Sequence, residues 1–244
     1  MAVNIDNVYQ KVLAIANKEQ RGYITPQEFN LFANQAQMEI FEQYFYDINQ
    51  FNRVPGNLTE YSDMVNILEE KISAFEKFKV SPSSVSSSVI TLPSDVYRLG
   101  TVFSTVVTSN PIVERVSKKD IQLIINSPLT KPTDSRPVYV YQAPTTAGIS
   151  KIKIFPTATT YTTSNLSINY IKKPATVKWT YVVINDKAVH NSSATDLQNF
   201  ELHESEEVEL VNKILQLAGI SVKDYQLAQA ANNKDVNIIS QEKR

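Results

Sequence analysis

The stretch at residues 81–88 divides the chain, and it reads Ser81-Pro82-Ser83-Ser84-Val85-Ser86-Ser87-Ser88. A run this polar has too few apolar side chains to pack into a core, and its composition is typical of a linker or an exposed turn. Before it, apolar residues recur at helical spacings of three and four. After it, they alternate with polar residues, as in half-buried β-strands. The change of period indicates a domain boundary near residue 80.

Three helices are expected before this run. Apolar side chains in residues 5–17 form one stripe, which predicts an amphipathic helix. A second, long and aromatic-rich helix should begin at Pro26, because Thr25 and Glu28 have the spacing of a capping box and proline suits a first helical turn. A third helix is expected over residues 61–78.

Short runs rich in β-branched and aromatic residues follow and predict about five to seven strands. These runs are residues 89–92, 100–107, 138–141, 151–155, 166–171 and 180–184. One helical interruption is expected at residues 117–126, where Ser117 can cap. The helical period then returns in an acidic segment that Gly219 should end, and a further helix is expected from Ser221.

Together these patterns predict an α+β protein: a helical bundle formed by the N- and C-terminal helices, with a small antiparallel β domain inserted in it. The expected domains are residues 1–80 for the N-terminal helices, 81–202 for the β domain and 203–244 for the C-terminal helices that return to the bundle. Packing the two sets of helices together would bury both apolar stripes.

Composition excludes several classes of function. The 244 residues include no cysteine, two histidines and five glycines. Disulfides, thiolate metal sites, cysteine nucleophiles and three-histidine metal sites are therefore excluded, and the glycines spell neither of the common phosphate-binding loops. No apolar run approaches the roughly 18 residues that cross a bilayer, and the N-terminus lacks the features of a signal peptide. We expect a protein of the cytosol, or of a particle assembled there, with no membrane partner.

The net charge of −1 is a cancellation. Lys and Arg number 7 against 11 Asp and Glu in residues 1–79, 12 against 6 in residues 80–200, and 5 against 8 in residues 201–244. A basic middle between acidic flanks favours surfaces of opposite sign, which steer association with a partner or with copies of the same chain. Two solvated faces without a partner fit the counts equally well.

No residue is assigned a catalytic, cofactor-binding or metal-binding role, and the chain is not expected to be an enzyme. His190 lies in a polar, turn-like stretch and His203 precedes an acidic helix start, so surface positions are expected for both. The carboxylates at 69–70 and 204–207 have the spacing of solvated helix surfaces. An enzyme that uses such carboxylates is the weakest alternative.

Three lysine pairs are candidates for binding nucleic acid: Lys118-Lys119, Lys151 with Lys153, and Lys172-Lys173. The solvated side of a sheet explains them better than a DNA groove, because no recognition helix or aromatic RNA-binding cluster accompanies them. The excess of aromatic side chains in the expected second helix fits either a helix buried between neighbouring subunits or a wide core stripe in a monomer.

Four phrases occur in order in the β region, and a closing amphipathic helix follows Phe200. They are Leu92-Pro93-Ser94-Asp95-Val96-Tyr97-Arg98-Leu99, Arg136-Pro137-Val138-Tyr139, Ile152-Lys153-Ile154-Phe155-Pro156 and Ile168-Asn169-Tyr170-Ile171-Lys172-Lys173-Pro174. The ordered set resembles the head-to-tail adaptor proteins of short-tailed phages, the tail tubular protein A type, and the ring proteins of crAss-like phages. The similarity spans nearly the whole chain.

This resemblance implies a structural virion protein without enzymatic activity: a head–tail connector subunit, adaptor or ring protein, located at the head–tail interface of a virion assembled in the host cytoplasm. Its implied partners are copies of itself in a ring of about twelve subunits, the portal protein and adjacent ring or tail proteins. Viral DNA would pass through the ring without sequence-specific binding. The alternative is a β-sandwich that binds carbohydrate or protein and is carried on a helical stalk.

Overall fold

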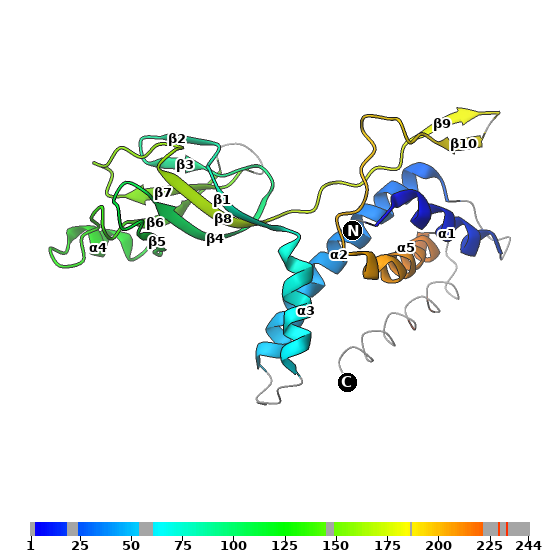
Figure 1. The fold of residues 1–244 in the computed structure, drawn as a ribbon, viewed down its shortest axis with the longest axis horizontal. Helices are drawn as coiled ribbons and strands as arrows, with labels where there is room; N and C mark the ends of the chain where they lie inside the picture. Colours follow the sequence, from blue (N-terminus) through cyan, green and yellow to red (C-terminus); the bar gives the residue numbers. More distant parts are fainter. Residues whose placement is uncertain are drawn as a thin grey trace. The chain divides into compact units, whose positions relative to one another are not determined.

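The chain divides into two compact units in the computed structural model, which describes residues 3–18, 24–53, 61–144, 149–185, 187–221, 229 and 233. Residues 75–173 form the sheet unit, and residues 1–74 with 174–244 form the helical unit (Figure 1). The sequence placed the β domain at 81–202. The boundaries differ because the segment after residue 173 packs with the helices.

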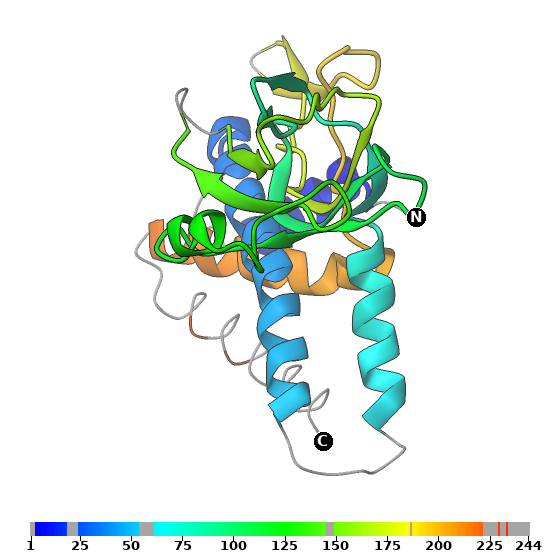
Figure 2. The same cartoon turned by 90° about the vertical axis from the view of Figure 1, so that its left-hand side faces the viewer.

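The helical unit contains α1 (Ile5–Lys18), α2 (Pro26–Arg53), α3 (Tyr61–Ser73) and α5 (Glu207–Ser221), with a 3₁₀ turn, η1 (Glu204–Glu206), before α5. Helix α5 packs against α1 and α2, and α3 packs against α2 (Figures 1 and 2). The first two expected helices are confirmed, and Glu28 closes the expected capping box by accepting the Thr25 N–H at 3.0 Å. The third ends five residues early. The helix expected from Ser221 falls almost wholly outside the described residues.

An extended strap, residues 174–180, lies along α2 and is held by side-chain amides of that helix. Asn30 accepts the backbone N–H of Trp179 at 2.8 Å and donates to its carbonyl at 3.2 Å. Asn34 bonds Val177 in the same way at 2.8 and 2.9 Å, and Gln37 donates to the strap at 2.8 Å. Because these amides lie at positions i, i+4 and i+7, they share one helix face and pair with alternate strap residues, as a neighbouring strand would.

A two-stranded hairpin follows the strap in the helical unit. It pairs β9 (Tyr181–Ile184) with β10 (Lys187–His190). Most of its β-branched side chains are about half exposed or more, including Val182, Val183 and Val189. The expected strand at 180–184 is therefore real, but it lies outside the main sheet.

The sheet unit is one eight-stranded sheet in the order β1-β8-β4-β5-β6-β7-β3-β2. The strands are β1 (Glu76–Val80), β2 (Ser84–Ser86), β3 (Val89–Thr91), β4 (Val96–Ser104), β5 (Ile112–Arg115), β6 (Val138–Gln142), β7 (Lys151–Phe155) and β8 (Leu166–Lys172). Neighbours are antiparallel except β5 and β6, which are parallel. The sheet curls like half a barrel around an apolar interior (Figure 1).

Alternation along the strands separates the two faces of this sheet. Ile152 and Ile154 of β7 face the curled interior, together with Tyr139 of β6. Val138 and Val140 face the other way and are covered by the short helix α4 (Ile121–Asn126), which lies within the interruption expected at 117–126. The strands β6 and β7 thus carry buried or partly buried side chains on both faces.

The predicted fold class, a helical bundle with a small antiparallel β insertion, is wrong. The largest element is the curled, mixed sheet, and the described residues form only five α-helices. Extended segments also contribute to the core of the helical unit, which was expected to consist of packed helices alone. Trp179 of the strap and Phe200 are both fully buried. The strands β1, β2, β5 and β10 were not predicted.

Residues 81–88 are not a linker. They contain β2, which pairs with β3 in a hairpin whose register places Val85 opposite Ile90. The turn residues Ser87 and Ser88 have φ of 49° and 65°. Two positive φ values suit the twist of a two-residue hairpin, but serine is not the residue type that usually signals such a turn. The composition of the run therefore concealed the strand.

Gly100 permits a close approach of β4 to β8, and replacing it with valine should destabilise the protein. A Cβ at this position would lie 3.0 Å from the backbone oxygen of Asn169, where the register of the two strands is irregular. Because the obstacle is backbone, we expect Gly100→Val to lower the free energy of unfolding by about 1–3 kcal/mol in urea denaturation. Thr101→Val on the same strand is the control, and an equal effect there would contradict this explanation.

Candidate functional site

The four recognised phrases meet in the sheet unit as two pairs of neighbouring strands. The first leads into β4 and the last forms β8, and these strands pair over most of their length. The Asp95 carboxylate accepts the Tyr170 hydroxyl at 3.0 and 3.2 Å, and the Asp95 carbonyl accepts the Lys173 N–H at 2.7 Å. The second and third phrases pair as β6 and β7, with Tyr139 opposite Ile154.

Asp95 therefore has a structural role, as the hydrogen-bond acceptor of the buried Tyr170 hydroxyl. Substitutions at the two positions test this contact. Burial, followed by the hydrogen bond to Asp95 and its charge, raises the pKa of Tyr170 to about 12. Asp95→Ala should cost about 1–3 kcal/mol of unfolding free energy, because it leaves the hydroxyl without its acceptor. Combining it with Tyr170→Phe should cost less than the sum of the two single changes in a double-mutant cycle. Additive effects would contradict a direct interaction.

Stability should also fall in alkaline solution. Burial, with Tyr141 acting in the same direction, raises the pKa of Tyr139 to about 12 as well. An unfolded tyrosine has a pKa near 10. A group whose pKa is raised on folding contributes its full stability below the unfolded value and loses it as the pH rises through the folded value. We expect the free energy of unfolding to decrease between about pH 10 and 12. Tyr170→Phe should flatten this decrease, and an unchanged decrease in that variant would contradict the contribution of Tyr170.

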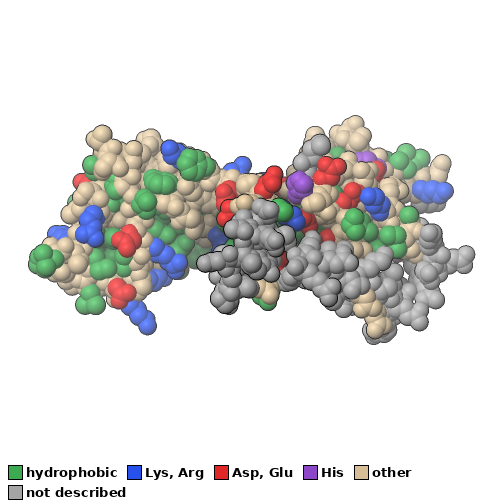
Figure 3. Space-filling model, turned by 60° about the horizontal axis from the view of Figure 1, so that its bottom comes forward, with side chains coloured by type: hydrophobic (Ala, Val, Ile, Leu, Met, Phe, Trp, Pro, Cys, Tyr) green, Lys and Arg blue, Asp and Glu red, His purple; other side chains and the backbone are tan. Residues whose placement is uncertain are grey.

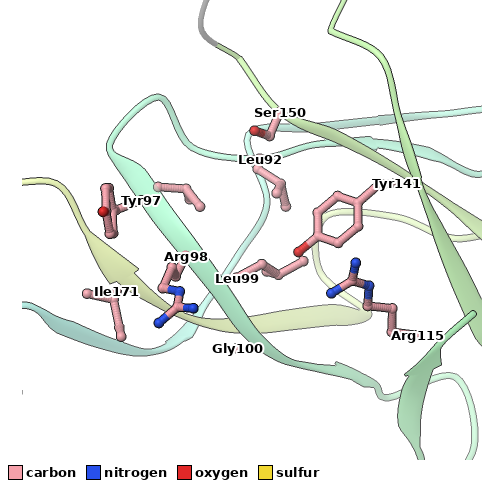
Figure 4. Close-up of a pocket in the computed structure, with 10 residues that line it drawn as sticks. Leu92, Tyr97, Arg98, Leu99, Gly100, Arg115, Tyr141, Ser150 and Ile171 are labelled. Carbon is pink, nitrogen blue, oxygen red and sulfur yellow. The ribbon is translucent and has the colours of Figure 1, made fainter. Parts of the chain in front are cut away.

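A hollow of about 480 Å³ lies beside β4 in the sheet unit (Figure 4). Arg98 of β4 and Arg115 of β5 line it together with Tyr141 of β6, and the Arg115 guanidinium lies 4.8 Å from the centre of the Tyr141 ring. The described residues that line the hollow include no carboxylate and no histidine. Its chemistry suits an anionic group and offers no acid–base pair.

A second hollow, the α4 groove, lies where α4 meets the outer face of β6 and β7. Its volume is about 420 Å³. Ile121, Val140 and Phe155 give it an apolar floor, and Lys118 and Lys153 are its charged residues. The Lys153 ammonium lies over the Phe155 ring, 5.4 Å from the ring centre. As in the first hollow, the described lining residues include no carboxylate. The groove thus combines apolar surface with positive charge.

The two histidines have structural partners. His190 is half-buried and stacks on Trp179 with a ring separation of 5.7 Å, so the expectation of a surface position is only partly met. His203 is exposed and caps η1: its Nδ1 accepts the Ser205 N–H at 3.3 Å and lies 2.9 Å from the Ser205 hydroxyl. That nitrogen serves a helix terminus.

The candidate carboxylates divide between pairing and solvent. Glu206 is buried and lies 2.6 Å from the Lys71 ammonium, while Glu207 lies 2.8 Å from Lys11. Glu69 and its neighbour at position 70 are exposed, as the sequence suggested. Within the described part of the chain, no group of three or more His, Asp or Glu side chains could hold a metal ion.

Charge divides between the two units more sharply than the sequence boundaries suggested. The sheet unit carries 12 Lys and Arg against 5 Asp and Glu, and the helical unit carries 12 against 20. The units therefore have net charges of +7 and −8. Blue side chains are spread over the visible face of the sheet unit, and red ones gather on the helical unit (Figure 3). The described helices include none long and apolar enough to span a membrane.

Sequence reasoning missed three features of these surfaces. The amide ladder of α2 has a readable signal, since Asn30, Asn34 and Gln37 follow helical spacing. The convergence of Arg98 with Arg115 has none, because it depends on the pairing of β4 with β5. For the α4 groove, the sequence analysis identified Lys118 and Lys153 as separate candidates and did not bring them together.

No protein-family model matches the chain, and no curated protein sequence matches it.

Proposed function

We propose that the protein is a structural, non-enzymatic subunit of a virion: a head–tail connector protein that forms a ring below the portal and provides a conduit for the DNA. The observation that carries this proposal is the pairing of the four recognised phrases in one sheet. Residues that are distant in sequence but belong to one resemblance contact each other, as Asp95 and Tyr170 do. Such phrases are expected to occur together, because each strand needs its partner.

The division of charge supports assembly into a ring. A ring closes through heterologous contacts, in which one surface of each subunit meets a different surface of the next. A sheet unit of +7 and a helical unit of −8 favour contacts between unlike units of neighbouring copies and disfavour contacts between like units. The copy number, about twelve, rests on the resemblance alone.

DNA would pass such a ring without sequence-specific binding. Lys151 and Lys153 lie on β7 and Lys172 lies on β8, and three strands separate β7 from β8 in the sheet, so these lysines do not form one continuous row for phosphate contacts. A lumen lined by the acidic unit would repel phosphate, whereas a basic lumen would retain it through strong, salt-dependent contacts. The helices are accordingly proposed to face the channel.

The test is native mass spectrometry and negative-stain microscopy of the purified protein, alone and mixed with a portal protein from the same genome. We expect closed rings, either spontaneously or on the portal. Genes for portal, terminase or tail proteins are expected next to its own. If the chain stays monomeric, does not bind the portal protein and binds glycans, the proposal is wrong and the protein is a carbohydrate-binding module.

A further inference from the structure

The exposed side of α2 is an acidic surface with apolar ends. Leu31, Gln35, Glu39, Glu42 and Tyr46 are all exposed, with Leu31 at 70% and Tyr46 at 64%. Spacings of three and four place them on one side of the helix, over about 22 Å of its length at the usual rise per residue. We call this stripe the acidic ridge. The only Lys or Arg in α2 is Arg53, its last residue.

The α4 groove is the chemical complement of this ridge. Lys118 and Lys153 have no salt bridge to a carboxylate among the described residues. Val140 and Ile121 beneath them are each 7% exposed, so the floor of the groove is apolar and closely packed. Two lysines beside an apolar floor suit two carboxylates flanked by an apolar or aromatic side chain.

We propose that the acidic ridge of one copy docks in the α4 groove of the next copy. Glu39 and Glu42 would pair with Lys118 and Lys153, and Tyr46 would cover apolar surface of the groove. The proposal rests on the ring function above and names the contact that builds the ring. It commits to a second copy because ridge and groove lie on units of opposite net charge in the same chain, so that each copy offers both halves of a heterologous contact.

Charge reversal tests the contact directly. One variant carries Lys118→Glu and Lys153→Glu, and the other carries Glu39→Lys and Glu42→Lys. Each places like charges opposite each other, so each alone should self-associate at least about tenfold more weakly than the unchanged chain. All four positions lie on the surface or at its edge, and circular dichroism should show an unchanged fold.

Complementation gives the sharper result. In an equal mixture of the two variants, every ridge meets a groove of opposite charge on the other variant. We expect the mixture to form rings with equal numbers of the two chains, which native mass spectrometry resolves when one chain is labelled with ¹⁵N. A chain carrying all four reversals should also assemble by itself. Lys131→Glu with Lys173→Glu, two exposed lysines away from the groove lining, is the matched control and should assemble normally.

The outcomes separate this contact from the ring hypothesis. If the unchanged chain forms rings and the reversed variants do so equally well, the ridge–groove contact is wrong and the ring stands. Loss of assembly without recovery in the mixture or in the four-substitution chain also overturns the contact. If the reversals abolish portal binding but leave self-assembly intact, the groove binds portal and not a second copy. A chain that never assembles, even with portal, overturns the ring hypothesis itself.

Discussion

Trp179→Ala is expected to lower the free energy of unfolding by about 3–5 kcal/mol. Trp179 is 1% exposed and is the only tryptophan of the chain. Its ring lies 4.2 Å from that of Tyr9 and stacks on Tyr181 and His190 at 5.7 Å. Its indole N–H donates to Asp6 at 2.9 Å. Alanine would leave a cavity, an aromatic cluster without its central ring, and a carboxylate without its donor.

The measurement is guanidinium denaturation followed by circular dichroism, because the variant lacks the fluorescent reporter. Trp179→Phe separates packing from hydrogen bonding: it keeps an aromatic ring, so it should cost less than alanine while still losing the bond to Asp6. Val183→Ala is the surface control, since Val183 is 63% exposed, and it should change stability by about 0.5 kcal/mol or less. A loss below about 1 kcal/mol for Trp179→Ala would refute this account of the cluster.

Local sequence signals predicted the helices that have strong boundaries. The capping box of α2 involves Thr25 and Glu28 only, and both act within one turn of the chain. The strands β6, β7 and β8 were predicted because each is a short run rich in β-branched and aromatic residues. The order in which the strands pair could not be predicted, because neither strand has a sequence pattern that indicates the parallel pairing of β5 with β6.

The third helix shows why a period can mislead. Ile72, Phe75 and Phe78 continue the helical spacing past Ser73, so residues 61–78 were predicted as one helix. The chain instead enters β1, which pairs with β8 almost a hundred residues later. The Lys79 N–H donates to the Asn169 side chain at 2.8 Å. A distant partner thus overrides a local period that was equally consistent with either structure.

The candidate surfaces depend even more on tertiary structure. Lys118 and Lys153 are 35 positions apart in sequence and share a groove only because α4 folds back over β6 and β7. The strap was hidden for the same reason: its partners are side-chain amides of α2, and such amides usually indicate a solvated helix face. The unequal distribution of charge is the surface property that the sequence did indicate, and it is larger between the two units than between the segments counted along the chain.

Glu206→Ala should cost about 3–5 kcal/mol, because it leaves a largely buried ammonium unpaired. Glu206 lies 2.6 Å from the Lys71 Nζ, and the two side chains are 5% and 19% exposed. The pair joins α3 to the turn before α5, and the same ammonium lies 5.7 Å from the Tyr44 ring centre. Thermal and urea denaturation should both report the loss.

Two comparisons decide whether the unpaired charge is the cause. Asp196→Ala breaks an exposed ion pair with Lys178, whose side chains are 54% and 55% exposed, and it should cost at most about 1 kcal/mol. Lys71→Met combined with Glu206→Leu removes both buried charges and should recover most of the stability lost by Glu206→Ala, because the apolar pair needs no desolvated ion. If that double variant is as unstable as Glu206→Ala, the loss comes from packing around α3, and the ion pair is not what joins the two segments.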